Sequence, residues 1–195
     1  MLDRVIHVAG VDEVGRGSLF GPVVAAAVIL SPEGAHRLQD LGVRDSKTLS
    51  HRQRQKLLGK ITEWAIDCQL GVASVAEIDR FNILQASLLA MKRAVLKLGE
   101  LPQVCLVDGT HPIPQLERVQ RTVVKGDRTE VAIAAASIVA KVWRDELITR
   151  LDPLFPQYDL RTNKGYGTKK HREAIAEWGL SCLHRRSFKL KSIQH

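Results

Sequence analysis

Short apolar runs alternate with longer amphipathic stretches along most of the chain. Two brief runs rich in β-branched residues, Val5 to Val11 and Val23 to Leu30, predict strands. The second run is apolar throughout and therefore predicts a buried strand. Three later segments of similar character predict further strands: Cys68 to Ser74, Val104 to Val107 and Val119 to Val124.

Three longer stretches have the periodicity of helices. Apolar residues recur at helical spacing over His51 to Ile66 and over Asn82 to Leu98. The third stretch begins at Glu130, is rich in alanine and ends at Pro153 and Pro156, and its small side chains require close packing on a neighbouring element. Strands interleaved with helices predict a mixed α/β core.

The composition changes after Pro156. Residues 157–195 are strongly basic, and they carry a glycine-rich loop, Lys164 to Thr168, followed by a short helix over about Lys169 to Trp178. We therefore expect a core over residues 1–156 and a small, basic, helical extension over residues 157–195.

The charge balance indicates a polyanionic partner. The 195 residues include 29 Lys and Arg against 21 Asp and Glu, so the formal net charge is +8, and the pI is about 9.7. Nucleic acid is the partner class that this balance favours, because Lys and Arg neutralise phosphates, although net charge also serves solubility alone. A hydrophobic content of 45% is ordinary for a soluble globular protein and excludes a disordered or fibrous chain.

The cysteines and the apolar runs predict where the protein resides. Cys68, Cys105 and Cys182 are odd in number and far apart, which argues against a disulfide framework and against a zinc site. A reducing cytoplasm is the compartment that we expect. The first residues lack the pattern of a secretory signal, and the longest apolar run, Pro22 to Leu30, is too short to span a bilayer.

Carboxylates follow several of the predicted strands. Asp12 and Glu13 come after the first strand, and Asp108 and Asp127 come after two later ones. Strand ends converge at one edge of an open sheet, so these acids would repel each other unless cations held them. One or two Mg²⁺ or Mn²⁺ ions, which prefer oxygen ligands, are the expected cofactor, and such ions can activate water for attack on a phosphodiester. A solvated turn is the alternative interpretation of Asp12 and Glu13.

Two glycines flank an arginine directly after the first pair of acids. Gly15, Arg16 and Gly17 do not form a dinucleotide-binding fingerprint, because Phe20 stands where the third glycine is required. A loop without side chains would let backbone groups approach a sugar or phosphate, with Arg16 supplying charge. A tight turn between two strands is the alternative.

Three further segments are candidate nucleic-acid contacts. They contain Ser46 and Lys47, Lys164 and Tyr166, and Arg186, and each could also be a solvated loop. Tyr166 lies between two glycines and could stack on a sugar or base.

Taken in order, these motifs resemble those of the bacterial-type ribonuclease HII family. The segment from Ala9 to Val28, AGVDEVGRGSLFGPVVAAAV, is similar to the opening signature of that family. Further matches follow in family order at Asp45-Ser46-Lys47, Asn82-Ile83-Leu84, Val107-Asp108-Gly109, Lys125-Gly126-Asp127, Ala134 to Lys141, Arg144-Asp145, Lys164 to Thr168 and His184 to Phe188.

The resemblance implies an α/β fold of the ribonuclease H-like type, a mixed sheet flanked by helices, with a C-terminal helical extension that helps to hold the duplex. It implies that four carboxylates bind Mg²⁺ or Mn²⁺ and catalyse: Asp12, Glu13, Asp108 and Asp127. It also implies that Gly15, Arg16 and Gly17 recognise the 2′-hydroxyl of a ribonucleotide and that Tyr166 contacts the RNA–DNA junction. A 2′-hydroxyl is what distinguishes RNA from DNA at one site, and backbone amides can hydrogen-bond it.

The function implied is an endonuclease that cuts the RNA strand of RNA–DNA hybrids and incises 5′ to a ribonucleotide embedded in duplex DNA, leaving a 3′-hydroxyl and a 5′-phosphate. We expect a monomer, and the last five residues show no sliding-clamp-binding peptide. The chain departs from the family pattern at Ser18, Phe20 and Asn163. We assign Asp145 a structural role, because Lys141 lies one helical turn before it.

Two alternative functions remain at this point. A DNA-directed nuclease or integrase of the same fold would share the acids and the metals, but it would cut all-DNA duplex. A non-catalytic binding module would keep the basic surface but would not need the acids.

Overall fold

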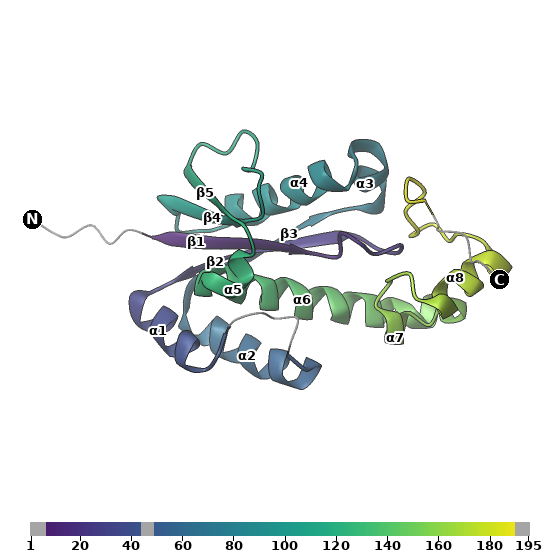
Figure 1. Cartoon of the computed structure of the whole chain (residues 1–195), viewed down its shortest axis with the longest axis horizontal. Coiled ribbons are helices and arrows are strands. Elements are labelled where there is room, and N and C mark those ends of the chain that lie inside the picture. The colour runs from purple at the N-terminus through teal and green to yellow at the C-terminus, as the bar shows by residue number, and fades with distance from the viewer. Residues whose placement is uncertain (1–6, 44–48, 190–195) are drawn as a thin grey trace, which may run out of the picture.

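The computed structural model describes residues 7–43 and 49–189 of the chain. A five-stranded sheet in the order β3-β2-β1-β4-β5 forms the centre of the molecule (Figure 1). All five predicted strands are present, and β2 (Val23–Leu30) has the predicted boundaries. The other four have shifted boundaries: β1 spans Val8–Val14, β3 Ala65–Ala73, β4 Val104–Asp108 and β5 Val119–Val123.

The sheet is mixed, as predicted. β1 and β2 form an antiparallel pair, and β3 continues the antiparallel half beyond β2. On the other side, β4 is parallel to β1 and β5 is parallel to β4. The C-terminal ends of β1, β4 and β5 therefore lie at the same edge of the sheet, where the candidate acids were expected.

Helices cover both faces of the sheet. On one face lie α3 (Val75–Phe81) and α4 (Ile83–Leu96), and on the other lie α1 (Pro32–Asp40), α2 (His51–Trp64) and α6 (Val131–Leu151) (Figure 1). Strand β2 is buried on both faces, because Ala25, Ala27 and Ile29 belong to the cluster that includes α4, whereas Val24, Ala26 and Val28 belong to the cluster that includes α2 and α6. The prediction of a buried second strand is confirmed.

The alanine-rich helix α6 packs as closely as its composition predicts. A Cβ atom on Gly10 of β1 would lie 2.0 Å from the carbonyl carbon of Ala132 in α6. Only a glycine facing small helix side chains allows a strand and a helix backbone to approach this far. Within the described ranges, no helix combines the length and apolar character needed to cross a membrane.

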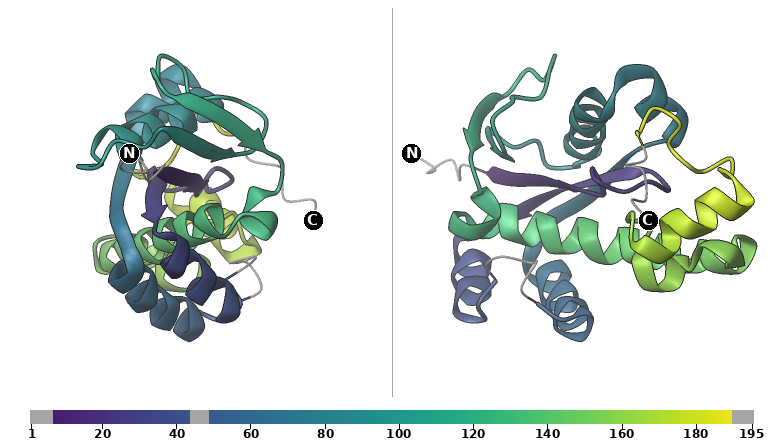
Figure 2. Two further views of the ribbon diagram at one scale, coloured as in Figure 1. Left: turned by 90° about the vertical axis from the view of Figure 1, so that its left-hand side faces the viewer. Right: turned by 45° about the vertical axis from the view of Figure 1, so that its right-hand side comes forward.

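The C-terminal part packs on the far end of α6. Two short 3₁₀ turns, Asp152–Leu154 and Pro156–Tyr158, lead to α7 (Leu160–Asn163) and α8 (Lys169–Trp178). Their apolar cluster includes Phe20, a residue of the loop between β1 and β2. The chain then crosses toward α3 (Figure 2). There, Asp79 accepts a hydrogen bond from the backbone N–H of Ser187 (3.0 Å). The boundary between core and extension at residue 156 stays a prediction. Residues on both sides of it share one apolar cluster.

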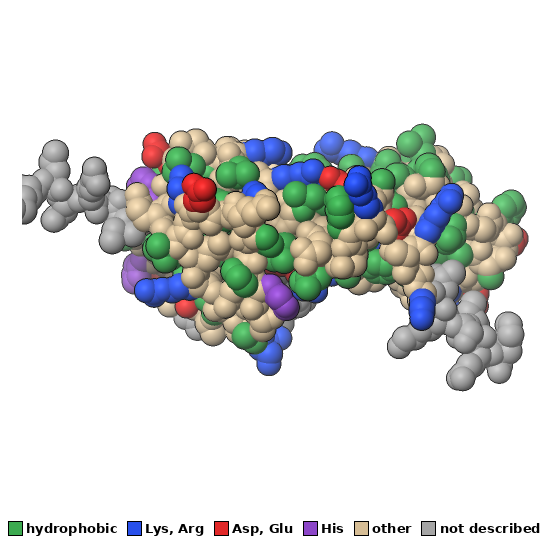
Figure 3. Space-filling view, turned by 90° about the horizontal axis from the view of Figure 1, so that it is seen from above, with side chains coloured by type: hydrophobic (Ala, Val, Ile, Leu, Met, Phe, Trp, Pro, Cys, Tyr) green, Lys and Arg blue, Asp and Glu red, His purple; other side chains and the backbone are tan. Residues whose placement is uncertain are grey.

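The face above α4 and β5 mixes basic and apolar side chains (Figure 3). Leu96, Leu101 and Val119 are exposed in this part of the chain. The Lys and Arg side chains visible there are scattered among apolar ones and do not form one continuous patch (Figure 3).

Candidate active site

Two neighbouring parallel strands bring three carboxylates together. β1 pairs with β4 as far as Val11 and Val107, so the next residues, Asp12 and Asp108, lie side by side. Glu13 follows on β1, and ligand oxygens of all three acids lie within 4.8 Å of one another. The predicted convergence of these three acids at one edge of the sheet is confirmed.

The first strand does not end where the sequence suggested. Its predicted end at Val11 is wrong, because pairing with β2 extends β1 to Val14. The ladder with β4 does end at Val11, so Asp12 and Glu13 lie beyond it on that side. Consecutive strand residues normally point to opposite faces, but at this open end both carboxylates reach the position of Asp108.

Hydrogen bonds orient the acids. The backbone N–H of Glu13 donates to Oδ1 of Asp12 (2.7 Å), and the Ser137 side chain on α6 also hydrogen-bonds Asp12. Asp108 Oδ1 accepts from the backbone N–H of Gly126 (2.8 Å). Glu13 Oε1 accepts from Arg16 Nη1 (3.2 Å). The acids are therefore held in place by the sheet edge, by α6 and by the turn that begins α5 (Gly126–Thr129).

The electrostatics of the cluster favour a bound cation. Burial raises the pKa of Asp12 well above its usual range, and the charges of Glu13 and Asp108 raise it further. Burial also raises the pKa of Glu13, against the opposing effect of Arg16. An all-oxygen donor set of crowded carboxylates fits a hard divalent ion, which would remove the repulsion that these shifts express. These residues therefore fit the expected metal.

Asp127 lies beside this group. It is on the short helix α5, four residues beyond the end of β5 at Val123, and its side chain is buried. The three-acid group within 4.8 Å does not include it among the described residues. Its chain neighbour Gly126 donates to Asp108, so Asp127 is next to the cluster through the backbone. Its role as a fourth ligand stays a prediction.

A groove of about 540 Å³ lies over the acids. Its lining includes Gly15 to Gly17 of what we call the glycine loop, residues 15–22, together with Lys141 and Arg54. Tyr166 lines the same groove from what we call the tyrosine loop, residues 164–168. The two loops lie side by side, because the N–H of Leu19 donates to the carbonyl of Gly165 (2.8 Å) and Ser18 bridges to Tyr166. The structure thus brings three of the four predicted acids, Gly15 to Gly17 and Tyr166 together in one groove.

Comparison with known proteins identifies the family. A family model described as Ribonuclease HII matches residues 9–191. The chain belongs to the ribonuclease HII family. It is 60% identical over 188 residues to a Ribonuclease HII of Acaryochloris marina, an alignment that covers 96% of this chain and 95% of that protein.

Solved structures of the family have the same fold. The ribonuclease H2 of Pyrococcus horikoshii superposes with a TM-score of 0.79 at 29% identity, covering 94% of each chain. A structure of the PCNA:RNase HII complex from Archaeoglobus fulgidus gives a TM-score of 0.80 at 29% identity, covering 97% of this chain and 98% of that one. The predicted ribonuclease H-like fold is confirmed. As a ribonuclease HII, the chain is a metal-dependent nuclease of the ribonuclease H type that acts on the RNA strand of RNA–DNA hybrids.

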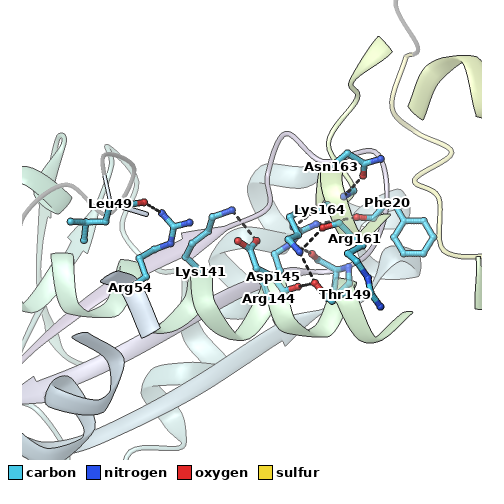
Figure 4. A network of polar contacts seen from close by, with 12 residues as sticks. Phe20, Leu49, Arg54, Lys141, Arg144, Asp145, Thr149, Arg161, Asn163 and Lys164 are labelled. Carbon is cyan, nitrogen blue, oxygen red and sulfur yellow. Dashed lines mark hydrogen bonds and ion pairs between the residues drawn. The ribbon is translucent and has the colours of Figure 1, made fainter. Parts of the chain in front are cut away.

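Two of the predicted contacts, Lys164 and Arg186, do not line this groove. Ser46 and Lys47 fall outside the described residues. The Lys164 ammonium is turned away from the acids and donates to Thr149 Oγ1 (2.6 Å) and to the Arg161 carbonyl, beside a second groove of about 440 Å³ (Figure 4). Arg186 is exposed near α3 and does not line the catalytic groove.

The sequence did not indicate that Ser137, Arg54 and Lys141 line the groove of this ribonuclease HII. Ser137 was visible only as a lone hydroxyl in an apolar helix, and Arg54 as one of many basic residues on α2. The expected pairing of Asp145 with Lys141 is confirmed at 2.8 Å on α6 (Figure 4), and its structural role stays a prediction. That pair holds Lys141 at the groove, a position that helical spacing alone did not indicate.

Proposed function

We propose that this ribonuclease HII incises duplex DNA 5′ to an embedded ribonucleotide, in addition to cutting RNA–DNA hybrids, and leaves a 3′-hydroxyl and a 5′-phosphate. The observation that supports this proposal most strongly is the position of the glycine loop. It lines the same groove as the three acids, so a phosphodiester over the acids would place the neighbouring sugar against that loop.

The carboxylates would hold Mg²⁺ or Mn²⁺. Asp12, Glu13 and Asp108 supply the oxygen ligands, and Asp127 is the proposed fourth. When bound, such ions activate a water and stabilise the leaving oxygen of a phosphodiester. Ser137 and the Gly126 N–H keep Asp12 and Asp108 oriented toward this position.

The glycine loop is suited to recognise a 2′-hydroxyl. No atom lies within 4 Å of the position that a Cβ on Gly17 would take, so its backbone faces open space. Gly15 has a φ of +92°, a conformation that side chains rarely adopt. Exposed backbone groups can donate to or accept from a 2′-hydroxyl, which DNA lacks. Half-exposed Arg16 would add a phosphate contact.

The remaining contacts would extend along the duplex. Tyr166 would meet the sugar at the junction, with the Lys141 ammonium 5.5 Å from its ring centre. Lys164 and Arg186, which lie outside the catalytic groove, would contact the backbone farther away. Ser46 and Lys47 remain candidate contacts. We further propose that the enzyme acts as a monomer in a reducing compartment.

The test compares the wild type with Asp108→Asn on a DNA duplex that contains one ribonucleotide. We expect the variant to incise at least on the order of 100-fold more slowly, because a metal ligand is lost. Asp40→Asn, an exposed change on α1, is the matched control and should keep the wild-type rate. Chelation by EDTA should abolish cutting.

Equal cutting by the wild type and Asp108→Asn, or cutting that survives EDTA, would contradict the proposal. An all-DNA duplex of the same sequence should remain intact. Its cleavage would indicate a DNA-directed nuclease.

A further inference from the structure

Two buried arginines lie beneath the glycine loop. Arg144 on α6 and Arg185 after α8 are 0% and 2% exposed. No carboxylate in the described part of the chain forms an ion pair with either one, although Asp145 and Asp79 are near enough to influence their pKa values. Buried cations normally require a charged partner or full hydrogen bonding, so what these two guanidinium groups bind is informative.

Arg144 joins the two loops that line the groove. Its Nε donates to the carbonyl of Pro22 (3.1 Å) and its Nη2 to that of Phe20 (3.0 Å), both in the glycine loop. Its Nη1 donates to the carbonyl of Lys164 (3.0 Å) in the tyrosine loop (Figure 4). One rigid planar group therefore sets the distance between the loop proposed to recognise the 2′-hydroxyl and the loop that carries Tyr166.

Glycines allow this close approach. A Cβ on Gly15 would lie 2.2 Å from Arg144 Nε, and a Cβ on Gly165 would lie 2.8 Å from the Phe20 carbonyl and 3.5 Å from Arg144 Nη2. Both glycines have a positive φ. The backbone of both loops thus rests directly on the guanidinium group, and any movement of that group would be transmitted to Gly15.

Arg185 supports the same loop from the C-terminal segment. Its Nε donates to the Gly21 carbonyl and its Nη1 to the Arg16 carbonyl, each at 2.9 Å. The acceptor on Arg16 belongs to the central residue of the glycine-arginine-glycine motif. The segment that carries Arg185 is itself fixed to α3, because Asp79 accepts from the backbone N–H groups of Arg186 (3.1 Å) and Ser187 (3.0 Å).

All five of these hydrogen bonds end on main-chain carbonyls. Burial lowers the pKa of both arginines, that of Arg185 to about 9, which leaves it protonated at neutral pH. Two like charges buried side by side are costly for a role in packing alone, because apolar side chains would fill the space without that cost. Five directional donors in fixed planes instead specify where the loop backbone lies.

We propose that Arg144 and Arg185 are positioning residues, which hold Gly15, Arg16 and Gly17 at a fixed place relative to Tyr166 and thereby determine selectivity for the 2′-hydroxyl. This inference rests on the proposed function. It also makes the C-terminal segment a part of the recognition site through the contact of Arg185 with Arg16.

The test uses Arg144→Lys and Arg185→Lys, which keep the positive charge but lose the planar fork. Two duplexes differ only at one nucleotide, which carries a 2′-hydroxyl in one and a 2′-fluorine in the other. Single-turnover incision rates are measured with saturating enzyme and Mn²⁺, duplex affinity by fluorescence anisotropy in EDTA, and Mn²⁺ affinity by calorimetry. Circular dichroism establishes that each variant is folded at the assay temperature.

We expect each variant to lose on the order of 10–100-fold in incision at the ribonucleotide, the effect of a loop displaced by about 1 Å. The ratio of the hydroxyl rate to the fluorine rate should fall, while duplex affinity and Mn²⁺ affinity stay the same. The matched control is Arg93→Lys. Arg93 also donates to a main-chain carbonyl, that of Val72 (2.7 Å), but far from the groove, so its loss should lower thermal stability and leave the rate ratio intact.

Folded variants that keep the wild-type ratio would overturn the inference, whether or not their overall rates fall. If Arg144→Lys does not fold, Arg185→Lys decides the question, since it gives up only two of the five bonds. A wild type that leaves the ribonucleotide duplex intact would instead refute the proposed function itself. Incision by the wild type with unchanged ratios in the variants would refute the positioning role alone.

Discussion

The floor and the wall of the catalytic groove are built in different ways. The floor consists of Asp12, Glu13 and Asp108, and it is set by the register of β1 with β4 and by hydrogen bonds with main-chain N–H groups and Ser137. The wall is the glycine loop, and it is held by side chains far away in sequence. Arg144 reaches Pro22 across 122 positions, and Arg185 reaches Arg16 across 169. The proposed chemistry thus depends on the pairing of two strands, whereas the proposed recognition of the sugar depends on two buried arginine side chains.

The strand that carries the floor should be destabilised when a larger side chain forces the sheet away from α6. Gly10→Val places atoms where a Cβ would already lie 2.0 Å from the Ala132 backbone, and backbone cannot move as a side chain can. We expect a loss of at least about 3 kcal/mol in the free energy of unfolding, above the usual cost of overpacking. Urea unfolding followed by circular dichroism measures it.

The control for that change is Gly59→Ala in α2. Its Cβ would meet nothing within 4 Å, so the substitution should stabilise the helix by about 0.5–1 kcal/mol. A Gly10→Val protein as stable as the wild type would show that the packing of β1 on α6 is looser than described.

The support beneath the wall should weaken in acid. The N–H of Ser181 donates to His184 Nδ1 (3.0 Å), so the neutral His184 ring donates from Nε2 to His171 Nε2 (3.1 Å). His171 Nδ1 then donates to the Tyr166 carbonyl (2.9 Å). Both rings must be neutral for this chain of hydrogen bonds, because a second proton would place two N–H groups against each other.

Burial, with a further contribution from the charge of His171, lowers the pKa of His184 to about 4. The unfolded chain binds this proton at higher pH than the folded one, so stability is lost as the pH falls from about 6.5 to 4. We expect a loss of about 2–3 kcal/mol in the free energy of unfolding over this range. Thermal melts at several pH values, for the wild type and His184→Gln, measure it.

The His184→Gln variant should show a flatter pH dependence than the wild type, because the titrating ring is gone. His36→Gln, on the exposed surface of α1, should retain the wild-type slope. Identical slopes for all three proteins would contradict this account of the wall.

The contributions of Asp12 and Asp79 to the stability of the fold should change in opposite directions as the pH changes. The pKa of Asp12 in the floor is raised, so its ionised form costs stability as the pH rises above about 3.8. For Asp79, which anchors the C-terminal segment, burial would raise the pKa, but hydrogen bonds from Ser187 and Arg186 outweigh burial and lower it. Its charge stabilises the fold above that pH and ceases to do so in acid.

At pH 7 without divalent ions, we expect Asp12→Asn to melt at a higher temperature than the wild type and Asp79→Asn at a lower one. Each substitution should change the free energy of unfolding by about 1 kcal/mol. Asp12→Asn should be inactive despite its greater stability. If both variants melt at a higher temperature than the wild type, or both at a lower one, the opposite roles assigned to Asp12 and Asp79 would be contradicted.

Local patterns predicted the floor and most of the fold. Apolar runs indicated all five strands, and acids at their ends indicated the three-acid cluster, because the carboxyl ends of parallel strands share one edge of a sheet. The exception is Asp127, which lies in the short helix α5, an element that no periodicity in the sequence revealed.

The support of the wall could not be predicted in this way. Arg185 and Arg186 are adjacent and chemically identical, yet the first is buried under the glycine loop and the second is exposed. Only the packing of residues after α8 against the β1–β2 loop distinguishes them. For the same reason, the sequence did not indicate that the Lys164 ammonium binds Thr149 and the carbonyl of Arg161.

We propose that the three acids and the glycine loop act on the same phosphodiester. The most direct test maps the product of the wild-type enzyme on an end-labelled DNA duplex with one ribonucleotide in the presence of Mg²⁺ or Mn²⁺. We expect a single incision on the 5′ side of the ribonucleotide, with a 3′-hydroxyl that a polymerase extends and a 5′-phosphate that a phosphatase removes. Incision on the 3′ side, scattered cuts in the DNA, or a 3′-phosphate product would contradict the account.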